Sequence, residues 1–295
     1  MNWCLARKLG WRVVLRIEDL DGPRVKPDAE RAVIEDLCWL GIDWDEGPTR
    51  QSERNHTYSV SVGKLLDAGA AYPCICTRKE VELAASAPHA EDGATVYPGT
   101  CRGRFASVEQ ARAITGRTPA IRFRVPDDDS SIIQWTDRFC GAQQFDARTL
   151  GDFVIAKADG TAAYQLAVVL DDAAAGVTQV VRGDDLLDST PRQILLYRAL
   201  GLGARLPTYC HIPLVVGTDG RRLAKRHGDS RIAYYRSLGV PAQRLIALVA
   251  QWSAMQAAGR TVSIANLVSG FRLDRLSIEP VIFTADDDAR LRNAM

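Results

Sequence analysis

Residues 11–18 read Trp11-Arg12-Val13-Val14-Leu15-Arg16-Ile17-Glu18, and this stretch decides the fold. Its short run of branched apolar residues predicts a β-strand. The predicted strand ends in the acidic residues Glu18, Asp19 and Asp21. In open α/β sheets the carboxyl ends of the strands face the ligand crevice, so these carboxylates are candidates for a functional site. The alternative is an ordinary turn rich in Asp and Gly, which needs no function.

Helix and strand signals alternate along the rest of the chain. Amphipathic patterns predict helices over residues 27–40 and 52–66, and the chain from residue 230 onward also has helical patterning. Short apolar or alternating stretches predict strands at 71–74, 120–125, 132–139, 153–156, 163–170 and 177–181. Such alternation is typical of α/β proteins, so we expect a mostly parallel sheet with helices on its faces.

The composition is that of an ordinary globular protein. The 295 residues are 46% hydrophobic and 25% charged, with a formal net charge of +1, which argues against a disordered chain. This charge neither requires nor excludes a nucleic-acid partner. No apolar run is long enough to span a bilayer, and the first residues lack the features of a secretory signal. We therefore expect a cytoplasmic protein with no membrane partner.

Three of the seven cysteines form a cluster. Cys74 and Cys76 are separated by one residue, and Cys101 follows in the same part of the chain. An odd number of cysteines without an export signal favours reduced thiols or metal binding over disulfides. Zinc prefers four ligands in a tetrahedron, and the spacing leaves the fourth position open between His89 and Tyr97. The alternative is three unconnected thiols.

The other cysteines lie in apolar surroundings and are expected to be small buried residues. They are Cys4, Cys38, Cys140 and Cys210.

A basic segment follows the predicted turn at residues 217–220. It contains Arg221, Arg222, Lys225, Arg226 and His227. A solvated charged surface is the ordinary interpretation of such a run, and binding of phosphate groups is the functional one.

Four blocks of sequence, in order, resemble the glutamyl-tRNA synthetase group of class I aminoacyl-tRNA synthetases. The blocks are Arg16-Ile17-Glu18-Asp19, the Cys-x-Cys…Tyr-x-x-x-Cys pattern of residues 74–101, Tyr164-Gln165-Leu166-Ala167 with Val181-Arg182-Gly183-Asp184-Asp185, and Arg222-Leu223-Ala224-Lys225-Arg226. Each block alone is weak, but their order and spacing make a specific match over most of the chain. The tyrosine in the cysteine pattern and the short length favour the queuosine-modifying branch of the family.

The resemblance implies a Rossmann-like α/β catalytic domain that joins glutamate to AMP and passes the glutamyl group to queuosine in tRNA(Asp). The implied partners are ATP with Mg²⁺, L-glutamate and tRNA(Asp) bearing queuosine, and we expect a monomer. We expect the catalytic domain at residues 1–70 and 119–229, a zinc-binding insertion at 71–118 and a helical C-terminal region at 230–295.

The resemblance also assigns roles to individual residues. Glu18 is expected to bind the ammonium group of glutamate, and Arg182 with Tyr164 its side-chain carboxylate, because a guanidinium and a phenol donate hydrogen bonds to such a group. Lys225 corresponds to the second lysine of the family's KMSKS-like loop and is expected to bind ATP and stabilise charge on its phosphates. Zn²⁺ is expected on Cys74, Cys76, Cys101 and Tyr97, with His89 kept as the alternative fourth ligand. Outside the family context, Tyr164 is an ordinary core or groove aromatic and Arg182 an ordinary ion-pair partner.

The strand and HIGH-type signature that open the family's fold have no counterpart in these residues. In the doubly wound order that strand lies at the middle of the sheet, so we expect two inner strand edges without their partner. An upstream start of the coding sequence is one interpretation, and a decayed paralogue without adenylating activity is another. The alternative functions are a non-catalytic tRNA-binding paralogue and a fragment of a glutamyl-tRNA synthetase.

Overall fold

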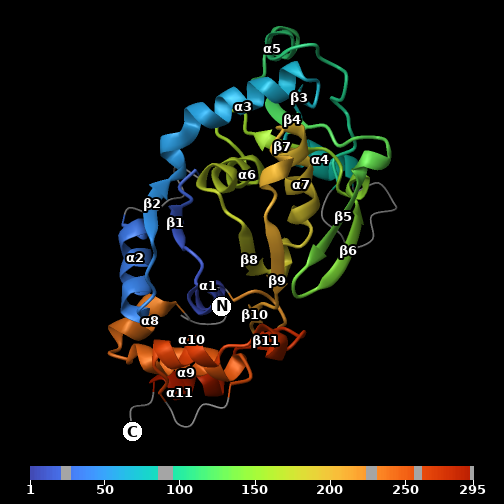
Figure 1. Ribbon diagram of the computed structural model, residues 1–295. Helices are drawn as coiled ribbons and strands as arrows, with labels where there is room; N and C mark the ends of the chain where they lie inside the picture. The colour runs from blue at the N-terminus through green and yellow to red at the C-terminus, as the bar shows by residue number, and fades with distance from the viewer. Residues whose placement is uncertain (21–27, 86–95, 224–230, 256–260, 293–295) are drawn as a thin grey trace.

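The computed structural model describes residues 1–20, 28–85, 96–223, 231–255 and 261–292. Figure 1 shows the C-terminal helices at one end of the molecule and the cysteine-containing segment at the other. The parallel strand pairs β1–β2 and β8–β9 lie between these two ends, so they form the middle of the molecule.

The first parallel pair contains the acidic stretch of the sequence. Strand β1 (Val14–Ile17) pairs with β2 (Glu46–Arg50), and helix α2 (Ala29–Leu40) lies in the connection between them. The strand and helix predicted for this region are therefore confirmed, at slightly shorter bounds. Helix α1 (Asn2–Leu9) buries its apolar side chains in a cluster shared with the C-terminal helices.

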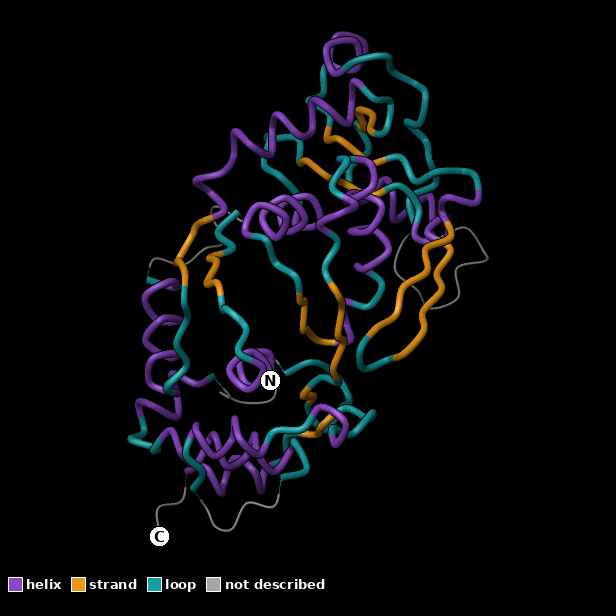
Figure 2. Tube along the Cα trace, in the orientation of Figure 1, coloured by secondary structure: helices purple, strands orange, loops and turns teal. Residues whose placement is uncertain are grey.

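The second parallel pair consists of β8 (Gln179–Gly183) and β9 (Thr208–Ile212), connected through helix α7 (Ser189–Ala199). Within the described residues, no strand forms hydrogen bonds to both parallel pairs, and Figures 1 and 2 show them as separate units.

The prediction of a strand at residues 163–170 is wrong, because this segment belongs to helix α6 (Tyr164–Ala175). Every side chain from Leu166 to Ala173 is buried, so the helix is enclosed on nearly all sides. A helix that is buried all round has no polar face, and the apolar run then lacks the periodicity that distinguishes a helix from a strand.

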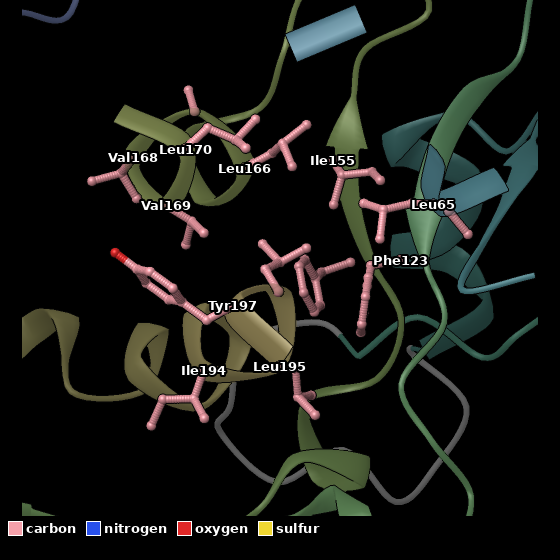
Figure 3. Packing of buried hydrophobic residues seen from close by; sticks show 14 of the residues in the cluster. Leu65, Phe123, Ile155, Leu166, Val168, Val169, Leu170, Ile194, Leu195 and Tyr197 are labelled. Atoms are coloured by element: carbon pink, nitrogen blue, oxygen red, sulfur yellow. The ribbon is translucent and has the colours of Figure 1, made fainter. Parts of the chain in front are cut away.

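Helices α6 and α7 pack against each other and against the central strands to form the largest core. Figure 3 shows this packing, in which Val169 of α6 points toward the ring of Tyr197 of α7. The core also takes side chains from a three-stranded sheet, which are labelled in Figure 3 as Phe123 and Ile155. The buried core therefore holds α6 against this three-stranded sheet. The packing also determines the position of Tyr164, the first residue of the helix.

The strands between residues 71 and 156 are antiparallel. Strands β3 (Ala71–Cys74), β4 (Ala120–Phe123) and β7 (Phe153–Ala156) form one sheet, and β5 (Ile132–Asp137) with β6 (Gly141–Asp146) forms a hairpin. The strand positions predicted here are confirmed. The predicted parallel direction is wrong for these strands and holds for the parallel pairs described above. The helices of this part are α3 (Asn55–Asp67), α4 (Arg78–Ala85) and α5 (Val108–Thr115).

The C-terminal part is helical, as predicted, apart from one short strand. Its helices are α8 (Ile232–Ser237), α9 (Ala242–Trp252), α10 (Ile264–Gly270) and α11 (Ala285–Arg292). Strand β11 (Val281–Ile282) pairs in parallel with β10 (Val215–Val216). No helix in the described ranges combines the length and the apolar character that a membrane span needs.

The buried environment expected for the four separate cysteines is confirmed for Cys4 and Cys210 only. Cys38 is exposed because it lies on α2, a helix without buried side chains. Cys140 is exposed because it lies in the turn between β5 and β6.

Candidate functional site

Arg182 is held by four hydrogen bonds at the end of β8. Its Nε donates to His211 Nε2 at 2.9 Å, Nη1 to Gln193 Oε1 at 2.9 Å, and Nη2 to Thr190 Oγ1 at 2.8 Å and the carbonyl oxygen of Leu186 at 3.2 Å. All four acceptors are neutral, since an imidazole nitrogen that accepts a hydrogen bond carries no proton. Within the described residues this half-buried cation therefore has no carboxylate in direct contact.

The structure brings together three of the residues that the sequence predicts for the site. Burial raises the pKa of Tyr164, the carboxylate of Glu18 adds to the rise, and the nearby Arg182 opposes it. Burial also lowers the pKa of Arg182, and Tyr164 opposes that change. Tyr164 is the first residue of α6 and keeps 39% of its surface exposed. The accessible phenol of Tyr164 therefore lies within electrostatic range of both the Glu18 carboxylate and the Arg182 guanidinium.

Glu18 follows β1 and is paired with an arginine from the same strand. Its Oε1 accepts a hydrogen bond from Arg16 Nη2 at 3.0 Å, while Arg16 Nη1 donates to Asp172 Oδ1 of α6 at 2.5 Å. Arg16 thus connects β1 to α6 and fixes the position of Glu18 relative to Tyr164. No separate role was predicted for Arg16, although it belongs to the first block of the resemblance.

A second carboxylate of α6, Asp171, connects this helix to α3 and to the segment that precedes α3. It accepts hydrogen bonds from Tyr58 Oη at 2.8 and 2.9 Å, Arg54 Nε at 2.6 Å and Gln51 Nε2 at 2.9 Å. Such a group of donors compensates for the burial of a charged carboxylate. The orientation of α6, and with it the position of Tyr164, depends on this cluster.

A buried carboxylate–imidazole pair that the sequence did not indicate lies directly behind Arg182. His211 Nδ1 is 2.6 Å from Asp137 Oδ2, and neither side chain has exposed surface. Burial raises the pKa of Asp137, but hydrogen bonds from His211 and from the backbone N–H groups of Cys140, His211 and Phe139 outweigh it and lower the pKa to about 2. Asp137 is therefore a permanent anion at neutral pH.

The basic loop is only partly described. Lys225 and the alternative zinc ligand His89 both lie outside the described residues. Arg222, at the start of the loop, donates from Nη1 to Asp185 Oδ2 at 3.2 Å and is highly exposed.

The cysteine cluster has the geometry of a metal site. The sulfur atoms of Cys74, Cys76 and Cys101 lie within 4.8 Å of one another and can hold a metal ion. The Tyr97 hydroxyl lies among them, 3.3 Å from the Cys74 sulfur and 3.7 Å from the Cys76 sulfur, and accepts the backbone N–H of Cys101 at 2.8 Å. The guanidinium of Arg122 covers the Tyr97 ring at 3.7 Å from its centroid. Three thiols and a phenol form a set of four donors that suits zinc.

Comparison with known proteins identifies the family. The chain matches the family model of class I tRNA synthetases (E and Q), catalytic domain, over residues 1–286. The chain belongs to the class I glutamyl- and glutaminyl-tRNA synthetases. The expected family, enzyme class and α/β fold are thereby confirmed.

Individual relatives within the class I synthetases lie close in sequence and structure. A glutamyl-Q tRNA(Asp) synthetase of Symbiobacterium thermophilum is 44% identical over 300 aligned positions, which cover 99% of this chain and 91% of the relative. A protein of the same name from Rhodopirellula baltica is 46% identical over 85% of this chain and 77% of its own length. The crystal structure of a glutamate tRNA ligase from Elizabethkingia meningosepticum, in complex with its amino acid, matches with a TM-score of 0.78 and 28% identity. That match covers 97% of this chain and 63% of the solved enzyme, so the chain spans less than two thirds of it.

Proposed function

We propose that this synthetase activates glutamate with ATP to form glutamyl-adenylate and transfers the glutamyl group to queuosine of tRNA(Asp). The observation that carries the proposal is Arg182, a half-buried cation whose described acceptors are all neutral and which lies beside Tyr164 and Glu18. A half-buried cation whose hydrogen-bond partners are neutral favours the binding of an oppositely charged ligand.

The charges of this site match those of free glutamate. Glutamate carries one ammonium group and two carboxylates at neutral pH. Arg182 and the Tyr164 hydroxyl are the proposed donors to the side-chain carboxylate, and Glu18 is the proposed acceptor for the ammonium group. Glutamine has the same shape but offers a neutral amide in place of the carboxylate, so it leaves the charge of Arg182 uncompensated and binds more weakly.

The proposed reaction has two steps and needs no nucleophile from the protein. The α-carboxylate of glutamate attacks the α-phosphate of ATP, which forms the mixed anhydride and releases pyrophosphate. A hydroxyl group of queuosine then attacks the carbonyl carbon, an ester forms, and AMP leaves. Mg²⁺ is proposed to accompany ATP, bound mainly by phosphates and water. Lys225 is proposed to stabilise the charge that develops on the phosphates, on the basis of its position in the family's loop.

The cysteine cluster is proposed to hold one structural Zn²⁺. The three sulfur atoms and the Tyr97 oxygen lie close enough to serve as its four ligands, which favours Tyr97 over His89. The ion would connect the end of β3 to the segment around Tyr97 and Cys101 and thereby fix this part of the chain. The proposed role is therefore structural.

The choice of acceptor RNA is supported by the named relatives. The two glutamyl-Q tRNA(Asp) synthetases described above match most of this chain and most of their own length. We propose the same acceptor here, with a single chain as the active unit.

The activation step can be tested by ATP–pyrophosphate exchange without tRNA. We expect exchange that depends on glutamate, with glutamine and aspartate giving much lower rates. Absence of glutamate-dependent exchange would contradict the proposal. Tight binding of tRNA without any exchange would instead support the non-catalytic alternative.

A further inference from the structure

The strand register places a histidine directly beside the cation of the site. In the parallel pair β8–β9, Arg182 is the register partner of His211, so both side chains lie on the same face of the pair. Tyr209, two residues earlier on β9, lies under the guanidinium at 5.3 Å from ring centroid to Cζ. Arg182 therefore lies on a surface formed by β9, with its Nε–H directed at His211 Nε2.

The hydrogen bonds of Asp137 determine which nitrogen of His211 carries the proton. Asp137 Oδ1 accepts the backbone N–H groups of Phe139, Cys140 and His211 at 3.0, 2.9 and 3.1 Å. The other oxygen, Oδ2, is left to accept from His211 Nδ1 at 2.6 Å. The proton of the neutral imidazole then resides on Nδ1, and Nε2 is free to accept from Arg182.

We propose that Asp137 and His211 are positioning residues that orient Arg182 for the glutamate side chain. This inference rests on the proposed function, because it assumes that Arg182 binds a carboxylate. His211 accepts the Nε–H of Arg182. Gln193 accepts one N–H of Nη1, and Thr190 and Leu186 accept the two N–H groups of Nη2.

Four of the five guanidinium N–H groups are engaged in this way, and one N–H of Nη1 stays outside these bonds. A cation oriented before binding loses little conformational freedom when its ligand arrives. Asp137 also supplies a negative charge on the side of His211 that faces away from Arg182. The neutral imidazole of His211 separates this charge from the guanidinium, so Asp137 does not form an ion pair with Arg182.

The substitution Asp137→Asn tests the tautomer with almost no change of shape. The three backbone N–H groups keep the amide oxygen at the position of Oδ1, so the amide nitrogen has to face His211 Nδ1. Nδ1 then becomes an acceptor and the proton moves to Nε2, where it opposes the Nε–H of Arg182. We expect the dissociation constant for glutamate to rise about tenfold, because one hydrogen bond to a charged group is lost, while that for ATP stays unchanged.

Two substitutions of His211 form a matched pair. The side-chain oxygen of glutamine can occupy the position of Nε2, whereas asparagine is too short to reach Arg182. We expect His211→Asn to weaken glutamate binding about tenfold and His211→Gln to restore most of the affinity. A purely structural role for His211 would predict similar losses for both and for ATP as well.

The experiment combines calorimetric titration of glutamate and of ATP with ¹⁵N NMR of the histidine rings in the full chain. The signal of His211 among the four histidines is assigned by its loss in His211→Gln. Asp152→Asn serves as the control, since Asp152 is another buried carboxylate, hydrogen-bonded to Tyr72 at 2.5 Å and remote in the fold from β9.

The expected result is a proton on Nδ1 in the unsubstituted chain, its transfer to Nε2 in Asp137→Asn, and a loss of glutamate affinity in that variant but not in Asp152→Asn. A proton on Nε2 in the unsubstituted chain would overturn the inference, and the NMR spectrum shows this even if a variant does not fold. Equal glutamate affinity of Asp137→Asn and the unsubstituted chain would also overturn it, with the proposed function left intact. If the unsubstituted chain binds no glutamate, the proposed function fails and the inference fails with it.

Discussion

At the scale of single residues, the proposed binding of glutamate depends on the direction of the Arg182 N–H groups as well as on the charge of this side chain. Lysine keeps the charge but offers a single ammonium group, which cannot contact His211, Gln193 and Thr190 at the same time. We expect Arg182→Lys to raise the KM for glutamate by about tenfold or more in ATP–pyrophosphate exchange, and to leave the KM for ATP unchanged.

The control for this change is Arg78→Lys, since the side chain of Arg78 is 94% exposed and lies on α4. It should have the kinetics of the unsubstituted chain. An equal KM for glutamate in Arg182→Lys would mean that Arg182 does not bind the substrate.

Asp137 also gives a prediction for the pH dependence of stability. Its pKa is lowered from 3.8 to about 2 in the folded chain, so the native state favours the ionised form. The corresponding stabilisation is complete above the unfolded pKa and is lost as the pH falls from about 4 to about 2.

Asp137→Asn removes this contribution. We therefore expect the substitution to lower the free energy of unfolding by about 2 kcal/mol at pH 7, and the difference to shrink below pH 4. Urea unfolding at several pH values measures it. A difference that stays constant down to the acid limit would show that the carboxylate charge is not the cause.

The site residues differ in how far the sequence could predict them. Glu18, Tyr164 and Arg182 lie in short blocks that resemble a known family, and the structure brings them together. Asp137 and His211 lie in no such block, and a single histidine in an apolar strand carries no functional signal. Only the register of β8 with β9 places His211 beside Arg182, and register depends on long-range packing.

At the scale of secondary-structure elements, α6 is held in place by its two adjacent carboxylates. Tyr58 is 2% exposed, and its hydroxyl donates a hydrogen bond to Asp171. This contact connects α3 to α6. We expect Tyr58→Phe to lower the free energy of unfolding by about 1–2 kcal/mol, because the buried carboxylate loses one of its donors.

Tyr197→Phe is the matched control for this substitution. The Tyr197 hydroxyl is buried, points away from the packed side chains in Figure 3 and has no hydrogen-bond partner in the described ranges. Its removal should leave stability unchanged or slightly higher. Equal losses in the two variants, measured by chemical denaturation, would contradict the assigned role of the Tyr58–Asp171 contact.

The zinc proposal also belongs to this scale, because the four proposed ligands come from the end of β3, the residues just after it and the segment at residues 97–101. We expect about one zinc ion per chain after purification without chelator, and clearly less in Cys76→Ala. Metal analysis by mass spectrometry measures both. A zinc content near zero in the unsubstituted chain would contradict the four-ligand site, and an unchanged content in Tyr97→Phe would exclude the tyrosine as a ligand.

Elements with a clear local signal could be predicted from the sequence. Thr77 and Glu80, spaced as in the capping box S/T-x-x-E, form that box at the start of α4, with Thr77 N–H donating to Glu80 at 2.6 Å and Glu80 N–H to Thr77 Oγ1 at 3.2 Å. Helix α6 could not be predicted, since its burial on nearly all sides removes the amphipathic pattern. The direction of the strands could not be predicted from the sequence either, because the antiparallel sheet β3–β4–β7 depends on pairing between distant segments.

At the scale of the whole molecule, side chains rather than backbone hydrogen bonds connect the two parallel pairs in the part of the chain that the structure describes. Arg16 of β1 reaches Asp172 of α6, and α6 packs on α7, which lies between β8 and β9 in sequence. The proposed ammonium-binding residue Glu18 directly follows β1 of one pair, and the proposed carboxylate-binding residue Arg182 lies in β8 of the other. The site therefore exists only when both halves are held together, and recognition of glutamate reports on the assembly of the entire fold.

Transfer of labelled glutamate to tRNA tests the central claim most directly. The chain is incubated with ATP, labelled glutamate and either tRNA(Asp) containing queuosine, the same tRNA without queuosine, or tRNA(Glu). The account predicts label on the queuosine-containing tRNA(Asp) alone, and a slower gain of that label in Arg182→Lys at a glutamate concentration below its KM. Label on tRNA(Glu), or no label on any tRNA, would contradict it.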